Sequence, residues 1–229
     1  MGYFNKFERK IYSQNGEDGI TLELVRLLNP PHFFVEFGVQ TGVECNTRVL
    51  KHAGWCGVHW DSDHSDPDRG LYQESITAEN INGLFFKYQI PDVFGVLSID
   101  IDGNDYHVWN ALDARYRPSI VVIEYNASVP PEESRTISYN AEFRWDCTNY
   151  YGASFLALCR IGARKGYRLV CAEKRGVNLF FVRRNLLSAL PQEAISEKQS
   201  SLYWPPGYGP NNSGHTTDPL QRPWLEVEP

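Results

Sequence analysis

Polar side chains that could carry chemistry follow two predicted buried strands. They are Asp100, Asp102, Asn104 and Asp105 after the apolar stretch 94–99, and Glu124 and Asn126 at the end of the β-branched stretch 119–125. Ligands of an open α/β sheet bind outside the carboxyl ends of its strands, so we expect these groups to share one site. Crowded carboxylates need a cation, a shared proton or a hydrogen-bonded substrate, and oxygen ligands suit Mg²⁺, Ca²⁺ or Mn²⁺. We therefore predict a metal site at Asp100, Asp102 and Glu124. A site without metal is the alternative, because alternate strand residues face opposite sides.

His107 follows this cluster and is a candidate general base, because its unperturbed pKa lies near neutrality. A packing role on the first turn of a predicted helix is the alternative for this side chain. The sequence contains no Gly-x-Ser-x-Gly motif, and no cysteine lies in a motif that would activate its thiol. The predicted catalytic residues are Asp100, Asp102, Glu124 and His107.

A glycine turn with an acid on either side forms a second candidate site. The turn is Phe34-Val-Glu-Phe-Gly-Val-Gln-Thr-Gly42, and Asp61 ends the next strand roughly 20 residues further on. Its spacing, Glu-x-Gly-x-x-x-Gly, differs from the dinucleotide fingerprint Gly-x-Gly-x-x-Gly and argues against a nicotinamide-dependent oxidoreductase. Glu36 would repel a phosphate but attract an amino group, and Asp61 can bind both hydroxyls of a ribose. A turn whose glycines serve only packing is the alternative.

The elements that must position these residues alternate between strand and helix. Apolar stretches predict strands at 33–37, 56–60, 75–77, 94–99, 119–125, 167–171 and 178–182. Helical periodicity predicts helices at 17–28, 44–52, 80–88, 106–112 and 153–165. This alternation is typical of an α/β fold with a mostly parallel sheet, and the short turn at 172–177 predicts a terminal antiparallel hairpin.

Several segments together resemble the class I S-adenosylmethionine-dependent methyltransferases and, more narrowly, the FkbM-like group. The resemblance covers about residues 11–184 and rests on the stretches 13–19, 35–47, 97–106, 121–126 and 151–154. It implies a Rossmann-like seven-stranded sheet with helices on both faces, S-adenosylmethionine as the methyl donor, and a domain over 1–190. Related macrolide-sugar methyltransferases hold Mg²⁺ with acids at the same strand ends, which agrees with the predicted metal.

The resemblance also implies roles for particular residues. Glu36, Gly38 and Gly42 would face the methionine part of the donor, and Asp61 its ribose. The remaining implied donor contacts are Thr77, Ala78 and Glu79 near the adenine, and Ser13, Gln14 and Asp18 closing over the donor from the N-terminal side. Helix capping is the alternative role for 13–19, and it is compatible with donor contact.

Two segments lie outside the regular pattern. Residues 127–152 form a predicted lid, and the predicted substrate contacts there and beside it are Asn126, Trp145, Tyr150 and Tyr151. Packing of the lid onto the sheet is the alternative role for its aromatic residues. Residues 191–229 form a tail rich in Pro and Gly, which we expect to wrap over the surface or over a partner subunit of a homo-oligomer, because Trp204 and Trp224 would otherwise be exposed.

Composition excludes several classes of protein. The net charge is −6 with no basic run, which argues against nucleic acid as a partner. The five cysteines are widely spaced and contain no Cys-x-x-Cys motif, which disfavours a disulfide framework and a zinc site. No apolar run approaches the roughly 20 residues of a membrane span, and the first ten residues do not resemble a secretory signal. We expect a reduced, cytoplasmic protein.

These observations lead to one expected activity. Hydroxyl acceptors need help in losing a proton, which the acids at 100–105 and 124 could provide, and an aromatic lid suits a sugar-like acceptor. We expect S-adenosylmethionine-dependent O-methylation of a sugar, glycan or natural-product intermediate. N-methylation of a small amine, or a binding module without catalysis, are the alternatives.

Overall fold

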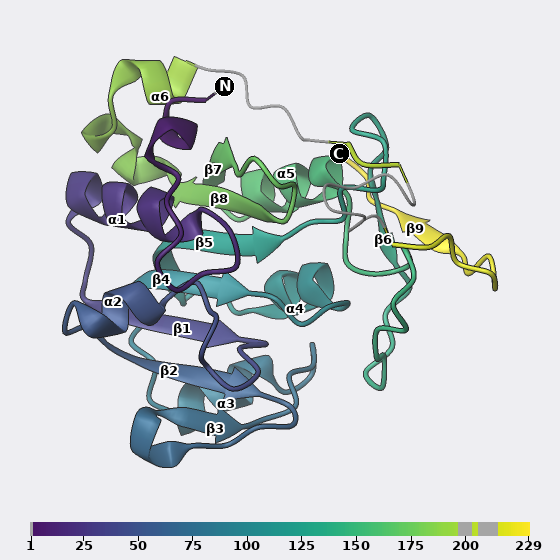
Figure 1. Ribbon diagram of the computed structural model, residues 1–229, viewed down its shortest axis with the longest axis horizontal. Coiled ribbons are helices and arrows are strands. Elements are labelled where there is room, and N and C mark those ends of the chain that lie inside the picture. The colour runs from purple at the N-terminus through teal and green to yellow at the C-terminus, as the bar shows by residue number, and fades with distance from the viewer. Residues whose placement is uncertain (1, 197–202, 206–214) are drawn as a thin grey trace.

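The centre of the molecule is a seven-stranded sheet (Figure 1). The computed structural model describes residues 2–196, 203–205 and 215–229. The strands, in spatial order, are β3 (Leu71–Gln73), β2 (Cys56–Asp61), β1 (Phe33–Phe37), β4 (Val93–Ile99), β5 (Arg117–Glu124), β8 (Asn178–Arg183) and β7 (Tyr167–Ala172). β1 to β5 run parallel, whereas β8 is antiparallel to both β5 and β7. The predicted mostly parallel sheet with a terminal antiparallel hairpin is confirmed.

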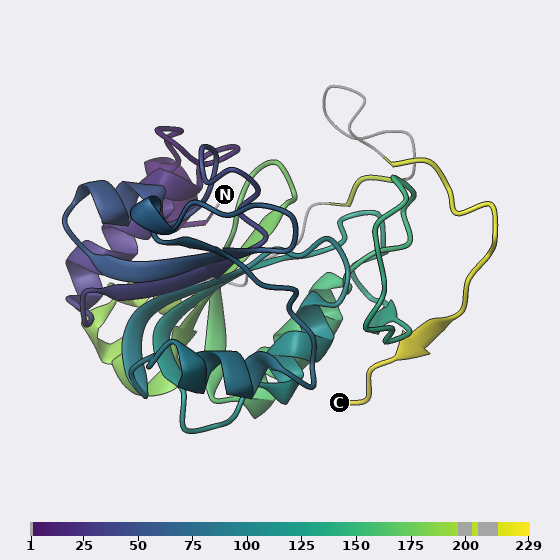
Figure 2. The same ribbon diagram turned by 90° about the horizontal axis from the view of Figure 1, so that it is seen from below.

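Helices cover both faces of the sheet, as Figure 2 shows edge-on. One face carries α1 (Glu17–Leu28), α2 (Arg48–His52) and α6 (Gln192–Ser196), together with the 3-10 helices η1 (Phe4–Phe7) and η3 (Arg184–Ala189). The other face carries α3 (Ile81–Lys87), α4 (Asp105–Ala111) and α5 (Phe155–Arg164). β5 is buried on both sides, since the side chains of residues 120–123 are all 0% exposed. The sequence run Ile-Val-Val-Ile reflects this double burial.

The third strand lies earlier in the chain than the sequence pattern predicted. The prediction of a strand at 75–77 was wrong, because β3 occupies Leu71–Gln73 and pairs with the end of β2. Only Leu71 of this edge strand is buried, so its polar sequence carries little strand signal. The segment of residues 62–70 contains instead a short 3-10 helix, η2 (Pro67–Arg69).

The second helix is also shorter than predicted, since α2 begins at Arg48 rather than at 44. The preceding residues form a turn whose backbone N–H groups at Asn46 and Thr47 donate to the Glu36 carboxylate. Tertiary hydrogen bonds from β1 therefore replace the first helical turn.

The lid and the described part of the tail contact each other. Within the lid, β6 (Arg135–Ile137) pairs antiparallel with β9 (Trp224–Glu226), which lies near the C-terminus. The Tyr150 hydroxyl donates to the Pro223 carbonyl at 2.8 Å, and the Arg135 guanidinium lies 4.8 Å from the Trp224 ring. Figure 1 shows this pair beside the carboxyl ends of the parallel strands. Among the described residues, no helix has the length and apolar character needed to cross a membrane.

Candidate active site

The glycine turn after β1 brings the chain close to the end of β4. Gly38 has φ +80°, and a Cβ atom at this position would lie 1.3 Å from the carbonyl oxygen of Asp100. The Gly38 N–H donates to the Trp60 carbonyl of β2 at 2.9 Å. Only glycine allows this conformation and this close approach together. The turn therefore joins the ends of three neighbouring strands in one place.

Glu36 lies behind this turn as a buried hydrogen-bond acceptor. Its carboxylate accepts from the backbone N–H groups of Asn46 and Thr47 and from the hydroxyls of Thr47 and Ser98. The side chain is 3% exposed, and burial raises its pKa despite these four donors. All four favourable acceptor positions of the carboxylate are thus used within the protein.

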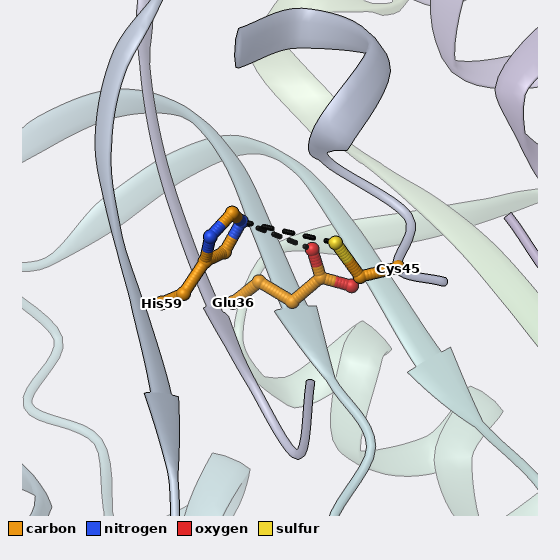
Figure 3. A group of neighbouring side chains, drawn as sticks. All are labelled: Glu36, Cys45 and His59. Carbon is orange, nitrogen blue, oxygen red and sulfur yellow. Dashed lines mark hydrogen bonds and ion pairs between the residues drawn. The ribbon is translucent and has the colours of Figure 1, made fainter. Parts of the chain in front are cut away.

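Figure 3 shows Glu36 beside Cys45 and His59. One atom of each side chain that could bind a metal lies within 4.8 Å of the other two. This spacing suits a metal ion, but the Thr47 hydroxyl lies 2.6 Å from Glu36 Oε2 and 2.9 Å from His59 Nε2. The hydroxyl donates to the carboxylate and accepts from the imidazole, so both groups already have a partner. The arrangement is a buried polar network that supports the turn before α2.

Asp61 ends β2, and its two carboxylate oxygens differ in their partners. Oδ1 accepts from the N–H groups of Asp63 and His64 and lies 2.8 Å from His64 Nδ1. Oδ2 accepts from the Gln40 N–H at 2.6 Å. No further donor to Oδ2 occurs in the described parts of the chain, so this oxygen retains capacity for a ligand hydroxyl.

The region around Asp61 is a pocket of about 360 Å³, here called the lid pocket. Its walls come from the ends of β1 and β2, the residues after β3 and β4, and the lid. The lining residues are Gly38, Gln40, Asp61, Ser62, Asp63, His64, Glu74, Ser75, Ile76, Ile101, Asp102, Asn104, Ala141, Glu142, Phe143, Arg144 and Trp145. Arg144 pairs with Asp63 at 3.1 Å and so joins the lid to the loop after β2.

A second pocket of about 150 Å³, here called the acidic pocket, adjoins the first. Its lining residues are Gln14, Glu36, Gly38, Gln40, Glu44, Cys45, Asn46, Asp100, Asp102, Glu124 and Asn178. Gly38, Gln40 and Asp102 line both pockets. Oxygen atoms of Asp100, Asp102 and Glu124 lie within 4.8 Å of one another, so the acids expected to share a site are together.

Crowding and burial change the acidity of these carboxyl groups. Burial and the charge of Asp102 raise the pKa of Asp100 well above its usual range. Burial and the charge of Asp100 do the same for the pKa of Glu124. The neighbouring Asp105 accepts from two backbone N–H groups, yet burial raises its pKa to about 6. The cluster therefore favours a shared proton or a bound cation.

Two oxygen atoms in the acidic pocket have no hydrogen-bond partner among the described residues. They are Glu124 Oε2 and Asn178 Oδ1, both buried. The Asn178 side chain is 2% exposed, and its amide nitrogen donates to Glu17 Oε1. An unpaired buried oxygen is costly, so both atoms are candidates for contact with a cation or with a donor group of a ligand.

The N-terminal residues expected near the methyl donor form hydrogen bonds mainly with neighbouring parts of the chain. Asp18 Oδ2 accepts from the N–H groups of Ile11, Tyr12 and Ser13 and from the Ser13 hydroxyl. Asp18 therefore holds the segment of residues 11–13 that precedes α1, and the Ser13 hydroxyl accepts from the Asp18 N–H at 3.2 Å in the first turn of the helix. Gln14 differs, because it lines the acidic pocket.

Other predicted residues line neither pocket. Thr77, Ala78 and Glu79 precede α3, and the shift of β3 puts residues 74–76 along the lid pocket instead. His107 lies 2.8 Å from the Ile137 carbonyl through Nε2, and burial lowers its pKa. Gly42 adopts φ +69° and lines neither pocket.

The predicted substrate contacts are divided between the pocket and the lid interior. Trp145 lines the lid pocket. Asn126 donates to the carbonyls of Asn149 and Tyr151 and so holds the lid to the end of β5. Tyr150 and Tyr151 are both buried, and burial together with Glu124 raises the pKa of Tyr151.

Sequence reasoning missed Gln40, Asp63 and Asn178. The first two follow predicted strand ends, which is a signal that could have identified them. Asn178 begins β8 and reaches the site only because β8 is antiparallel to β5, with Asn178 opposite Glu124.

No protein-family model matches the chain, and no curated protein matches its sequence. Solved structures with a similar fold include a 1,6-didemethyltoxoflavin-N1-methyltransferase from Burkholderia thailandensis with bound 1,6-didemethyltoxoflavin and S-adenosylhomocysteine. It has 11% identity and a TM-score of 0.44 over 71% of this chain and 74% of that chain. The N-terminal domain of EvdMO1 with SAH bound has 11% identity and a TM-score of 0.46 over 76% of this chain and 82% of that chain. An O-methyltransferase family protein from Burkholderia thailandensis has 12% identity and a TM-score of 0.43 over 74% of this chain and 59% of that chain. Similarity this low carries no argument about activity, which rests on the site itself.

Proposed function

We propose that the protein is an S-adenosylmethionine-dependent methyltransferase that methylates a hydroxyl group of a small-molecule or glycan acceptor. The observation that carries this proposal is the junction of two pockets at the carboxyl edge of the sheet. The lid pocket contains Asp61, whose Oδ2 can accept a further hydrogen bond, and the acidic pocket contains the cluster of Asp100, Asp102 and Glu124. Gly38, Gln40 and Asp102 line both pockets. S-adenosylmethionine in the lid pocket could present its methyl carbon to the hydroxyl group of a substrate in the acidic pocket.

The lid pocket has the groups that an adenosine requires. Asp61 Oδ2 can accept from a ribose hydroxyl, and Phe143 and Trp145 supply aromatic surface for a base. Glu36 has its acceptor positions filled, so we assign it to the support of the turn rather than to the methionine amino group. Asp102, which lines both pockets, is the carboxylate that we assign to that amino group.

The acidic pocket supports the removal of a proton from the acceptor. S-adenosylmethionine supplies an electrophilic methyl group, so the protein must mainly align the acceptor and take up its proton. Burial raises the pKa of both Asp100 and Glu124, and a carboxylate with a raised pKa is a stronger general base. We propose that one of this pair accepts the hydroxyl proton while the other carries a hydrogen bond.

The same groups fit a divalent cation of the Mg²⁺ type. The donor set consists of oxygen atoms only, and it includes the buried, unpaired Glu124 Oε2. When bound, such an ion would lower the pKa of an acceptor hydroxyl. Asp100 and Glu124 are the residues that we propose would hold it, with Asn178 Oδ1 beside them, while Asp102 remains assigned to the amino group of the methyl donor.

Binding of S-adenosylhomocysteine tests the first half of the proposal. Calorimetry should show saturable binding to the unmodified protein and at least about tenfold weaker binding to Asp61→Asn, since one charged hydrogen bond is lost. Asp68→Asn is the control, because Asp68 is exposed and lines neither pocket. Absence of binding at millimolar ligand would refute the assignment of the lid pocket.

Methyl transfer tests the second half. Labelled donor is incubated with a cell extract and the protein, with Mg²⁺ or with EDTA, and the labelled product is analysed for O-methyl and N-methyl groups. We expect O-methylation that Asp100→Asn strongly reduces. Transfer to an amine that neither EDTA nor Asp100→Asn affects would contradict both the hydroxyl acceptor and the metal, and donor binding without any transfer would favour a binding module.

A further inference from the structure

A groove with the opposite charge adjoins the acidic pocket. It has a volume of about 560 Å³, and its lining residues are Glu8, Arg9, Lys10, Gln14, Asn15, Gly16, Lys174, Arg175 and Trp204. Gln14 lines both this basic groove and the acidic pocket. Four cations and one carboxylate line the groove, although the chain as a whole has a net charge of −6.

Two of the four cations are available to a ligand. Lys174 lies 3.4 Å from Glu8, and Lys10 pairs with Glu44 of the acidic pocket at 3.0 Å. The side chains of Arg9 and Arg175 are exposed and have no carboxylate partner in the described ranges. Guanidinium groups bind phosphate oxygens in pairs of hydrogen bonds, which makes two free arginines a suitable phosphate site.

Buried carboxylates hold both backbone segments that carry these arginines. The segment after Arg9 is held by Asp18, which is 0% exposed and accepts three consecutive backbone N–H groups. The turn that contains Arg175 is held by Glu173, which is 1% exposed and accepts from the N–H groups of Arg175 and Val177. The backbone positions of both arginines are therefore fixed before a ligand binds, which lowers the entropic cost of binding.

Trp204 adds an aromatic side chain to the lining of the groove. Its backbone N–H donates to the Ala127 carbonyl at 2.8 Å, and its indole N–H donates to the Arg175 carbonyl at 3.1 Å. The side chain is half-buried, so part of its surface remains open to a ligand.

We propose that the acceptor carries a phosphate or diphosphate group, which binds in the basic groove while its hydroxyl reaches past Gln14 into the acidic pocket. This inference rests on the proposed methyltransferase function. The acids on one side of Gln14 repel an anionic group, and the cations on the other side attract it. The electric field of these charges therefore orients the acceptor with its phosphate in the basic groove and its hydroxyl in the acidic pocket. A sugar carried on a diphosphate is the substrate class that fits both ends.

Binding of inorganic pyrophosphate tests the groove without any need for the acceptor itself. Calorimetry should show binding that weakens with added salt, and the double variant Arg9→Ala/Arg175→Ala should lose at least about tenfold in affinity. Arg115→Ala removes an exposed arginine outside the groove and should change the affinity by less than about twofold. Three results would overturn the phosphate site. The first is an equal loss of pyrophosphate affinity in Arg115→Ala, and the second is binding of the dicarboxylate malonate as tight as that of pyrophosphate or tighter. The third is no binding of pyrophosphate.

Two further measurements separate this inference from the proposed function. The double variant should bind S-adenosylhomocysteine with unchanged affinity, and Asp61→Asn should bind pyrophosphate with unchanged affinity. Competition between the two ligands would mean that pyrophosphate occupies the lid pocket, and it would overturn the assignment.

Treatment of the extract with a pyrophosphatase that cleaves diphosphate diesters, followed by a phosphatase that removes the resulting monoesters, tests the link to the acceptor. Treatment before the methyl-transfer assay should abolish labelling if the acceptor is phosphorylated, whereas labelling that survives treatment would contradict the inference. Absence of labelling before treatment would count against the methyltransferase function, and the pyrophosphate titrations would then decide the groove independently.

Discussion

His59 should make the folded protein sensitive to acid in a defined pH range. Its side chain is 3% exposed, and Nε2 lies 2.9 Å from the Thr47 hydroxyl and 3.7 Å from Glu36. Burial lowers the pKa of His59 to about 4, with a smaller contribution from the nearby charge of Lys51. The imidazole is therefore neutral in the folded protein at a pH where an unfolded chain already protonates it.

The sign and size of the effect follow from this difference in pKa. A base with a lowered folded pKa contributes stability above its unfolded value, and this stability is lost as the pH falls through about 6.5 towards 4. Unfolding takes up one additional proton in that range. The His59 contribution to the free energy of unfolding should fall by about 2 kcal/mol between about pH 7 and pH 5, and by about 3 kcal/mol over the full range.

The assay compares the pH dependence of two proteins. Asp105, Glu173 and other carboxyl groups with raised pKa values change stability in the opposite direction, so the total stability does not isolate His59. Urea unfolding of the unmodified protein and of His59→Gln at each pH gives a difference in which these contributions cancel. The variant retains an N–H donor towards Thr47, and His52→Gln is the control for removal of an exposed histidine.

We expect the stability of His59→Gln relative to the unmodified protein to increase by about 2 kcal/mol on acidification from about pH 7 to pH 5. A difference that stays constant within about 0.5 kcal/mol would show that the folded protein does not exclude the proton. A difference of the opposite sign would mean that His59 forms an ion pair with Glu36, and it would refute the argument from burial.

Gly38→Ala should destabilise the protein by more than about 3 kcal/mol and abolish S-adenosylhomocysteine binding, because its Cβ would overlap the chain after β4. Gly42→Ala, where the nearest atom is 4.0 Å away, should cost only about 1 kcal/mol in urea unfolding, and equal costs would contradict the steric argument. Ser154→Ala should lower the free energy of unfolding by about 1 kcal/mol, because the Ser154 side chain caps the start of α5, and no change in thermal denaturation would contradict this role. Arg144→Ala should change the free energy of unfolding by less than about 0.5 kcal/mol, because its ion pair with Asp63 is exposed, and a larger loss would show that the lid depends on this pair.

Sequence patterns were sufficient to predict the framework of the fold. Apolar runs such as β1 and β5 are buried on both faces, so their sequences alone distinguish them from surface segments. The gathering of Asp100, Asp102 and Glu124 also followed from sequence, because parallel strands bring their carboxyl ends to one edge. Both conclusions depend only on local periodicity and on the direction of the strands.

The roles of individual acids were decided by the tertiary structure. Glu36 and Asp18 resemble ligand-binding residues in sequence, but each is occupied by backbone N–H groups that the fold brings within reach. The position of β3 depended on pairing with β2, because an edge strand buries too little apolar surface to leave a pattern. A residue's type sets which bonds it can make, whereas the surrounding chain determines which partners are present to make them.

Contacts between distant segments were likewise visible only in three dimensions. Asn178 reaches the acidic pocket because β8 runs antiparallel to β5, and Gln14 separates that pocket from the basic groove. The arginines of the groove, Arg9 and Arg175, lie in turns far apart in the sequence. Their proximity results from packing of the N-terminal segment against the turn between β7 and β8, which no local pattern encodes.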